Sequence, residues 1–106
     1  MSANNTYNAF EVFINETPEY HKIYLEAAQK FEQLSSFDAK TKELAYIAVI
    51  AATRREGSIP FHVKKAKALG ATREEIISAI FVGFPAVGNI VIYSLGLAIE
   101  AYDNLD

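Results

Sequence analysis

The run from Ile76 to Ile99 contains no charged residue, and this restricts the folds that are open to the chain. A helix of that length could cross a bilayer. However, Pro85, Asn89 and several glycines interrupt the run, and its flanks are chiefly acidic, whereas the cytoplasmic flank of a membrane span should be basic. A helix that is apolar all round is otherwise buried all round. We therefore expect a soluble protein without a membrane partner, in which this run is buried.

Burial of so long a run is difficult for one chain of 106 residues, because a small domain has a small core. The apolar content of 51% is slightly high for a globule of this size. Small residues such as Ala79, Gly83, Ala86 and Gly88 would let the backbones of two helices approach closely. These features predict that copies of the chain bury the run against one another in a homo-oligomer.

Charge and cysteine content exclude several functions. The formal charge is −3, whereas a nucleic-acid-binding protein is strongly basic. The absence of cysteine excludes disulfides, thiolate metal sites, thiol nucleophiles and Cys-x-x-Cys redox chemistry. Two histidines far apart in sequence form a poor ligand set, so no metal is expected. The N-terminus lacks a basic segment followed by an apolar one, so a cytoplasmic protein is expected.

Helix signals in the first third of the chain predict one or two helices. Residues 1–15 form a frayed tail or a short helix, with Phe10 and Phe13 as docking points. Thr17-Pro18 is typical of an N-cap and a first helical position. The helix that follows should run to about residue 34. Its apolar stripe recurs at three- and four-residue spacing and is expected to be buried; it comprises Tyr20, Ile23, Tyr24, Ala27 and Phe31.

The remainder of the chain is also predicted to be helical, without a linker, so residues 1–106 are expected to form one domain. Asp38 should cap a helix that runs to about residue 53, and Gly70 should end a short helix that carries His62. Thr72 and Glu75 have the spacing of a capping box. Pro85 should break the helix that follows, and a last helix should end near residue 102. No alternating run is bounded by hairpin turns, so the fold class is all-α, with about five to six helices.

Glu43 and His62 are the candidates for chemistry. An imidazole titrates near neutral pH, and a neighbouring carboxylate fixes its tautomer. Glu43 shares a helical face with Ile47 and Ile50, where burial would disfavour its charge unless a cation pairs with it. Alternatively, Glu43 is an exposed carboxylate in the first helical turns and His62 is a packed histidine without a function.

The spacing of the two residues limits how they could meet. Residue 43 lies roughly 15 Å before the end of its helix, at 1.5 Å per residue. If Pro60 began the next helix, His62 would lie only about 3–5 Å beyond the turn. The two side chains meet only if the second helix begins near Arg55 to Ser58, or if a partner subunit supplies one of them. We expect the early start.

The stretch from Lys42 to Asn89 resembles the carboxymuconolactone decarboxylase family, which is related to the alkylhydroperoxidase D-like proteins. The matching elements are Lys42-Glu43-Leu44, His62 with Ala66, Gly70-Ala71-Thr72, Glu74-Glu75-Ile76 and Gly83-Phe84-Pro85-Ala86. The best-matched part of the chain is 38–102. The resemblance implies a compact helical bundle of the alkylhydroperoxidase D type that assembles as a homotrimer or homohexamer.

The resemblance also implies a branch of the family. Members with peroxidase-type activity carry a Cys-x-x-Cys ahead of the histidine, and the matching positions here hold Arg55 and Ser58. Glu43 and His62 match the proton-relay Glu and His. The chain is more similar to the decarboxylase branch, which acts without a cofactor on a lactone that bears a carboxylate. The function predicted is cofactor-free decarboxylation or proton transfer on a small anionic molecule.

Three further residues are candidates for binding substrate. Arg55 would hold a carboxylate, although a solvated basic face is the commoner explanation, and six of the ten basic residues fall between Arg54 and Arg73. Ser58 is either an N-cap, which we favour, or a hydroxyl in the pocket. Tyr46 either lines the pocket or packs in the core. The alternative function is a non-catalytic oligomeric binding or scaffold protein, whose pocket would be filled by Phe61, Phe81 and Phe84.

Overall fold

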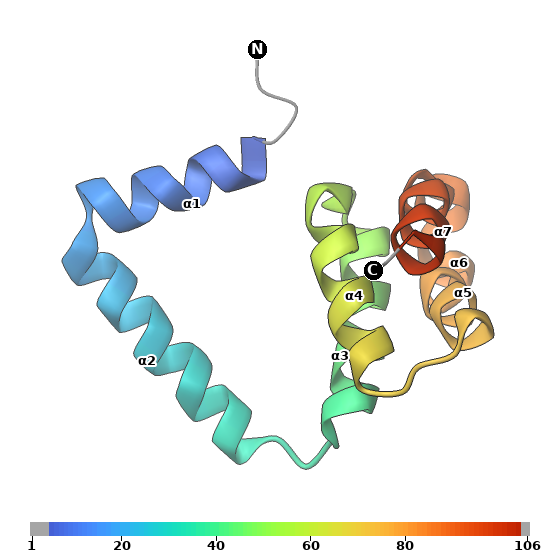
Figure 1. Ribbon diagram of the computed structural model, residues 1–106, viewed down its shortest axis with the longest axis horizontal. Coiled ribbons are helices and arrows are strands. Elements are labelled where there is room, and N and C mark those ends of the chain that lie inside the picture. The colour runs from blue at the N-terminus through green and yellow to red at the C-terminus, as the bar shows by residue number, and fades with distance from the viewer. Residues whose placement is uncertain (1–4, 105–106) are drawn as a thin grey trace. The chain divides into compact units, whose positions relative to one another are not determined.

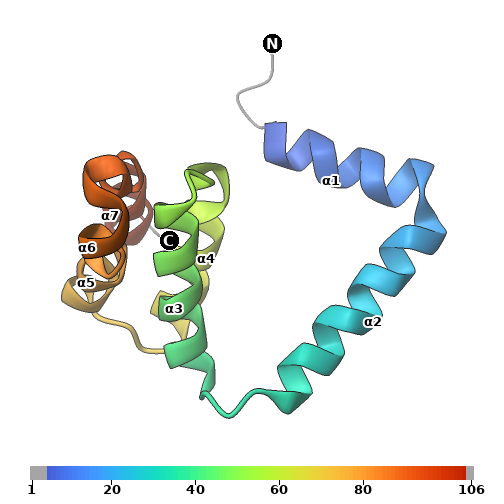
Figure 2. The same cartoon turned by 180° about the vertical axis from the view of Figure 1, so that it is seen from behind.

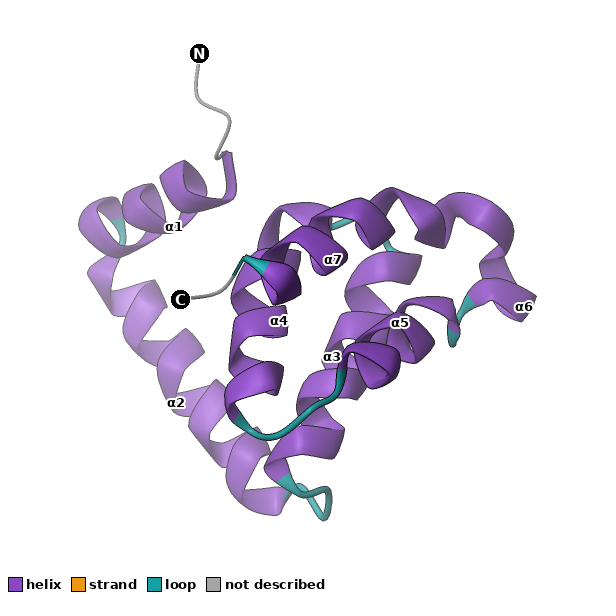
Figure 3. Ribbon diagram, turned by 45° about the vertical axis from the view of Figure 1, so that its right-hand side comes forward, coloured by secondary structure: helices purple, strands orange, loops and turns teal. Residues whose placement is uncertain are grey.

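The computed structural model describes residues 5–104 and divides them into one unit that ends at Ser36 and another that begins at Phe37. Helices make up both units, and the described residues contain no strand (Figure 3). The all-α prediction is therefore confirmed. Six of the helices span nine residues or more in this described part, in agreement with the five to six expected. The prediction that residues 1–106 form one domain stays a prediction.

The first unit is a pair of helices, α1 (Asn5–Glu16) and α2 (Pro18–Leu34), drawn in blue to cyan in Figure 1. Phe10 and Phe13 act as docking points, as predicted. Their ring centroids lie 6.1 and 5.5 Å from that of Tyr24, and the Phe13 ring also meets His21 edge-on at 5.3 Å. Four aromatic rings therefore fasten α1 to α2.

One prediction for this unit is confirmed and one is wrong. Thr17 is the N-cap residue of α2 and Pro18 is its first helical residue, as expected, although the Thr17 hydroxyl makes no capping bond and donates to the Phe13 carbonyl at 2.6 Å. The apolar stripe of α2 is not buried in the single chain, and Tyr20 and Phe31 are 71% and 73% exposed. Ile23, Tyr24 and Ala27 are exposed as well. Two helices alone cannot enclose a core, so the amphipathic pattern of α2 has no cover here.

The second unit contains the core. Its helices are α3 (Ala39–Ala52), α4 (Ile59–Ala68), α5 (Arg73–Phe81), the single turn α6 (Phe84–Val87) and α7 (Leu95–Asp103), with 3-10 segments η1 (Glu56–Ser58) and η2 (Gly88–Ser94). Figures 1 and 2 show α3 and α4 side by side, and α5 and α7 pack against them. Fully buried apolar side chains from these elements meet between them: Ile47, Ile59, Val63, Ile76, Ile80 and Val91.

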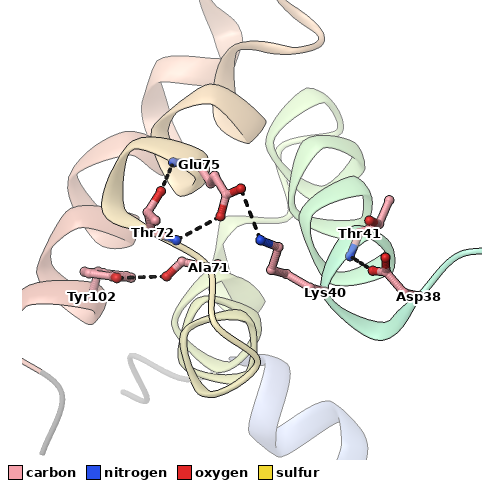
Figure 4. Close-up of polar contacts among 7 residues, drawn as sticks. All are labelled: Asp38, Lys40, Thr41, Ala71, Thr72, Glu75 and Tyr102. Carbon is pink, nitrogen blue, oxygen red and sulfur yellow. Dashed lines mark hydrogen bonds and ion pairs between the residues drawn. The ribbon is translucent and has the colours of Figure 1, made fainter.

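The predicted helix signals are present in this unit (Figure 4). Asp38 caps α3 by accepting from the Thr41 N–H at 2.7 Å. Thr72 and Glu75 form the capping box of α5, with bonds of 2.9 and 3.0 Å. Lys40 of α3 reaches Glu75 at 3.2 Å and so ties the starts of α3 and α5 together. Gly70 ends α4 with a φ of +99°, as expected of a left-handed stop.

The uncharged run is broken as its sequence predicts but is not fully buried in one chain. Pro85 lies in the single turn α6, and Gly88, with a φ of +78°, ends that turn. By length and composition Arg73–Asp103 could cross a membrane, and only 22% of its most apolar window is buried. Val82 and Tyr93 are 67% and 57% exposed, for example. The burial expected of this run is thus incomplete within the second unit.

Candidate active site

The turn between α3 and α4 decides whether Glu43 and His62 can meet. Arg54 adopts a left-handed conformation (φ +59°), and the Arg55 N–H donates back to the Ile50 carbonyl at 3.1 Å, which closes the end of α3. The helical path resumes at Glu56 in η1 and continues into α4, with Pro60 in the first turn of that helix. The expected early start is confirmed. Because the helical path resumes at Glu56, three residues ahead of α4, the chain returns along α3 far enough for His62 to reach Glu43.

Glu43 and His62 are in direct contact within one chain. The His62 Nδ1 atom lies 2.9 Å from Glu43 Oε1, a hydrogen-bonding distance. The side chains are 13% exposed for His62 and 9% exposed for Glu43, so the contact is largely shielded from water. Glu43 is therefore buried, not an exposed first-turn carboxylate. Both residues come from the α3–α4 hairpin, so a single chain supplies the pair.

The second ring nitrogen of His62 is left available. Among the described residues, none forms a hydrogen bond with Nε2, while Nδ1 is occupied by Glu43. A carboxylate on Nδ1 selects the tautomer that carries its proton there, so Nε2 holds a lone pair. An Nε2 lone pair at a partly buried ring is the geometry of a general base.

Two aromatic side chains frame the imidazole. The Tyr46 ring stacks on His62 with a centroid distance of 4.3 Å and an interplanar angle of 18°, and the Phe61 ring meets it edge-on at 5.0 Å. Tyr46 and Phe61 are 49% and 59% exposed, so each presents a face to solvent beside the imidazole. Core packing of Tyr46, one of the two readings of that residue, is wrong.

Three phenylalanines were expected to fill the pocket if the protein is not catalytic, and all three are partly exposed. Phe61, Phe81 and Phe84 are 59%, 37% and 46% exposed. Phe81 and Phe84 contact each other at a centroid distance of 6.3 Å and are joined by no ring contact to His62 in the described part of the chain. Of these three rings, Phe61 therefore lies against His62, and Phe81 and Phe84 do not.

Sequence reasoning missed Lys65. Its Nζ atom lies 3.4 Å from Oε2 of Glu43, the carboxylate oxygen that His62 does not use. Glu43 therefore has one partner on each oxygen, and both partners come from α4. The signal was available: Lys65 follows His62 by three residues, a spacing that places two side chains on the same face of a helix.

Arg55 and Ser58 do not join the pair. Arg55 is exposed, and none of the described contacts connects its side chain to Glu43 or His62. Ser58 stands at the N-cap position of α4 but makes no side-chain cap; its hydroxyl donates to the Arg55 carbonyl at 3.3 Å. The capping role favoured for Ser58 is therefore wrong. The early start of the helical path at Glu56 removes the helix end that its hydroxyl would have capped.

The charges next to the turn are paired with one another. The Arg54 guanidinium bonds both carboxylate oxygens of Glu56, at 2.8–3.1 Å, and lies 3.9 Å from the centroid of the Tyr93 ring. The Arg54 hydrogen bonds lower the pKa of Glu56 and hold that carboxylate ionised. These contacts tie the α3–α4 turn to η2 and so stabilise the backbone path that brings His62 to Glu43. No cluster of three or more metal-ligating side chains occurs among residues 5–104.

Comparison with known proteins agrees with this fold. Residues 18–100 match the model of the carboxymuconolactone decarboxylase family, and the chain belongs to that family. The structure is similar to the crystal structure of the apo form of a carboxymuconolactone decarboxylase family protein from Legionella pneumophila. The two are 28% identical, with a TM-score of 0.77, over 93% of this chain and 88% of the other. No match was found among curated proteins.

Proposed function

We propose that this protein catalyses a cofactor-free decarboxylation or proton transfer on a small anionic lactone or carboxylate, with Glu43 and His62 as the proton-handling pair. The observation that supports this most is the 2.9 Å contact between His62 Nδ1 and Glu43 Oε1, with Nε2 unpartnered among the described residues. Membership of the carboxymuconolactone decarboxylase family supports the same class of reaction.

The chemistry assigned to His62 is the movement of one proton at Nε2. When CO2 leaves a carboxylate, its bonding electron pair stays on carbon, and protonated His62 then donates a proton to that carbon. In a proton transfer, neutral His62 first accepts the proton through Nε2 and later returns it. Either reaction balances without a redox partner. The Glu43 carboxylate stabilises the imidazolium formed in either case, because the opposite charges are 2.9 Å apart in a site shielded from water.

Substrate contacts are assigned by position. The Tyr46 face beside the imidazole would receive the apolar part of a small ring, since it is stacked on His62 and half exposed. Arg55 and Ser58 lie on the turn that precedes α4, and Arg55 would attract the substrate carboxylate over a distance. The Ser58 hydroxyl would have to release the Arg55 carbonyl, to which it donates, before it could donate to substrate.

Self-association belongs to the same proposal. The apolar stripe of α2 and the outer face of Arg73–Asp103 are both exposed in the single chain, with Ile23 63% and Val82 67% exposed. Exposed apolar faces of this extent are typical of interfaces. We propose a homotrimer or homohexamer in which copies cover these faces. A non-catalytic oligomeric scaffold remains the second candidate, because these same faces favour assembly whether or not the site turns over.

Turnover of a carboxylate-bearing lactone tests the catalytic role. CO2 release would be measured from a panel of small lactones with a carboxylate, using wild type, His62→Ala and the matched control His21→Ala. His21 is the other histidine and packs against Phe13 in the first unit. We expect His62→Ala to abolish turnover while leaving the oligomer intact, and His21→Ala to retain it. Equal activity of His62→Ala and wild type would exclude the proposed role.

Thiol-dependent peroxidase activity is expected to be absent. The chain contains no cysteine, and reduction of a peroxide by this route needs a thiolate. Peroxide consumption by purified protein should equal that of a buffer blank. A rate above the blank, without any added thiol protein, would contradict the assignment.

A further inference from the structure

A narrow apolar face of α2 is left exposed by the rest of its unit. Five residues form it, within roughly 80° of the helix circumference at 3.6 residues per turn: Tyr20, Ile23, Ala27, Phe31 and Leu34. We call these five residues the α2 seam. Its four larger side chains are 63–81% exposed, whereas Tyr24, at one edge, packs on Phe10 and Phe13 of α1. So narrow a face matches the contact surface of one partner helix and not the wider face that a helix turns toward a globular core.

The spacing of the α2 seam is the same in both directions from Ala27. Ile23 and Phe31 lie four residues before and after it, and Tyr20 and Leu34 lie seven residues before and after it. Two antiparallel copies of α2 that cross at Ala27 therefore place Ile23 of each copy opposite Phe31 of the other. Tyr20 of each copy likewise lies opposite Leu34 of the other. The methyl side chain of Ala27 allows a close approach at the crossing point, so the seam is complementary to a second copy of itself.

Charges beside the α2 seam favour the same antiparallel arrangement. Glu26 and Lys30 are exposed and lie one helical turn apart along one edge of the seam. The twofold axis of an antiparallel pair turns this edge toward the same edge of the other copy. Lys30 of each copy then lies within about 3 Å, measured along the helix axis at 1.5 Å per residue, of Glu26 of the other. A parallel pair would instead place this edge opposite Tyr24 and Ala28, which carry no charge at neutral pH.

We propose that α2 pairs antiparallel with α2 of a second copy of this chain, in a twofold contact centred on Ala27. This inference rests on the self-association proposed above and names the surface that forms one of its contacts. A twofold contact joins copies in pairs, so the assembly contains an even number of subunits. Of the two assemblies proposed, it selects the homohexamer, in which three α2 pairs join two trimers. A lone trimer has no twofold axis and cannot contain this contact.

Single cysteines test where the two helices cross, because the chain contains no cysteine of its own. Full-length Ala27→Cys and the matched control Ala28→Cys would be treated with a mild oxidant, and covalent dimer would be measured on a non-reducing gel. A disulfide requires Cα atoms about 4.4–6.8 Å apart. Residue 27 meets itself on the twofold axis, so most Ala27→Cys chains should become covalent dimers. Residue 28 lies about 100° further round the helix, so Ala28→Cys should remain uncrosslinked.

Charge reversal tests the same contact without a crosslink. Lys30→Glu places like charges across the pair and should weaken association by about 3–10-fold, measured by sedimentation velocity. The double variant Glu26→Lys/Lys30→Glu restores opposite charges and should recover association. The matched control is Lys22→Glu, which makes the same change at an exposed position on the far side of α2 and should associate like wild type.

Three outcomes would overturn the pairing: an uncrosslinked Ala27→Cys, equal crosslinking of Ala27→Cys and Ala28→Cys, or a wild-type protein of three subunits. An oligomer that forms without the Ala27→Cys crosslink would remove this contact and leave self-association standing. A wild-type protein that is monomeric at every concentration would remove both. None of these measurements needs a substrate, so the catalytic role of His62 is tested separately by turnover of His62→Ala.

Discussion

The two units of this chain differ in how far their apolar side chains are buried. In the second unit, α3, α4, α5 and α7 enclose fully buried side chains such as Ile47 and Ile80. In the first unit, α2 has an equally regular apolar stripe but contains no buried residue. Helical periodicity therefore identifies an apolar face that must be buried, but it does not identify the element or chain that buries it. Four packed helices cover one another, whereas two helices joined end to end do not.

The largest expected effect comes from truncating one isoleucine in each unit. Ile80→Ala should cost about 2–5 kcal/mol of unfolding free energy, because the side chain is fully buried and a cavity remains. Ile23→Ala, at a position that is 63% exposed, should change the stability of the single chain by less than about 0.5 kcal/mol. Denaturant unfolding measures both values.

The same pair of variants distinguishes folding from assembly. Ile23→Ala should weaken self-association, detected by sedimentation velocity, if copies of the chain cover the α2 stripe. Ile80→Ala should lower stability at every protein concentration. Equal and concentration-independent losses for the two variants would contradict the difference between the units.

A smaller effect is expected at the two threonines that precede helices. Thr72→Ala should cost about 1 kcal/mol, because the hydroxyl accepts from the Glu75 N–H in a complete capping box. Thr17→Ala should cost less, because this hydroxyl makes no capping bond to α2 and, within residues 5–104, bonds the Phe13 carbonyl alone. Thermal unfolding of both variants against wild type measures the difference. A larger loss at Thr17 would show that its hydroxyl stabilises the first unit more than a cap does.

The smallest expected effect is a loss of stability of the second unit at acidic pH. Hydrogen bonds from Thr41 lower the pKa of Asp38, and those from Thr72 and Lys40 lower the pKa of Glu75. A carboxylate whose pKa is lower in the folded than in the unfolded protein stabilises the fold when the pH is above its unfolded pKa. That unfolded pKa is 3.8 for Asp and 4.5 for Glu. That stability is lost as pH falls through the folded value. The melting temperature should therefore decline below about pH 4.5.

Asp38→Asn separates capping from charge in this acid response. Asparagine caps a helix about as well as aspartate but does not titrate. The variant should match wild type in melting temperature near neutral pH within about 2 °C and should decline less in acid. A decline identical to that of wild type would show that Asp38 contributes nothing to the acid sensitivity of this unit.

The predictions from sequence succeeded where a local rule determines the outcome. Asp38, Gly70 and the Thr72–Glu75 box were each identified because a cap depends on residues close together in the chain. The Glu43–His62 contact also required the helical path to begin early, near Arg55 to Ser58. This early start was predicted, and the path begins at Glu56. Thr17 also occupies the predicted N-cap position of α2, but its hydroxyl donates to the Phe13 carbonyl, an acceptor within its reach, and makes no capping bond.

The failures in the site and in the first unit have a common cause. The stripe of α2, the packing of Tyr46 and the pairing of Lys65 all depend on what an apolar or charged face meets in space. Sequence spacing shows that Lys65 shares a face with His62, but only the antiparallel return of α4 along α3 places Glu43 between them. Contacts of this kind follow from the path of the chain and not from propensity.

The most direct test of the Glu43–His62 pair is to find which ring nitrogen of His62 carries the proton in wild type and in Glu43→Gln. Long-range proton–nitrogen NMR correlations report this at a pH where the imidazole is neutral. Because the Glu43 carboxylate contacts Nδ1, we expect the proton of wild-type His62 on Nδ1 and none on Nε2. In Glu43→Gln the preference for the Nδ1 tautomer should be lost. His21, the other histidine, should be identical in both proteins. A wild-type His62 that carries its proton on Nε2, or a tautomer unaffected by Glu43→Gln, would contradict the claim that these two residues act as one proton-handling pair.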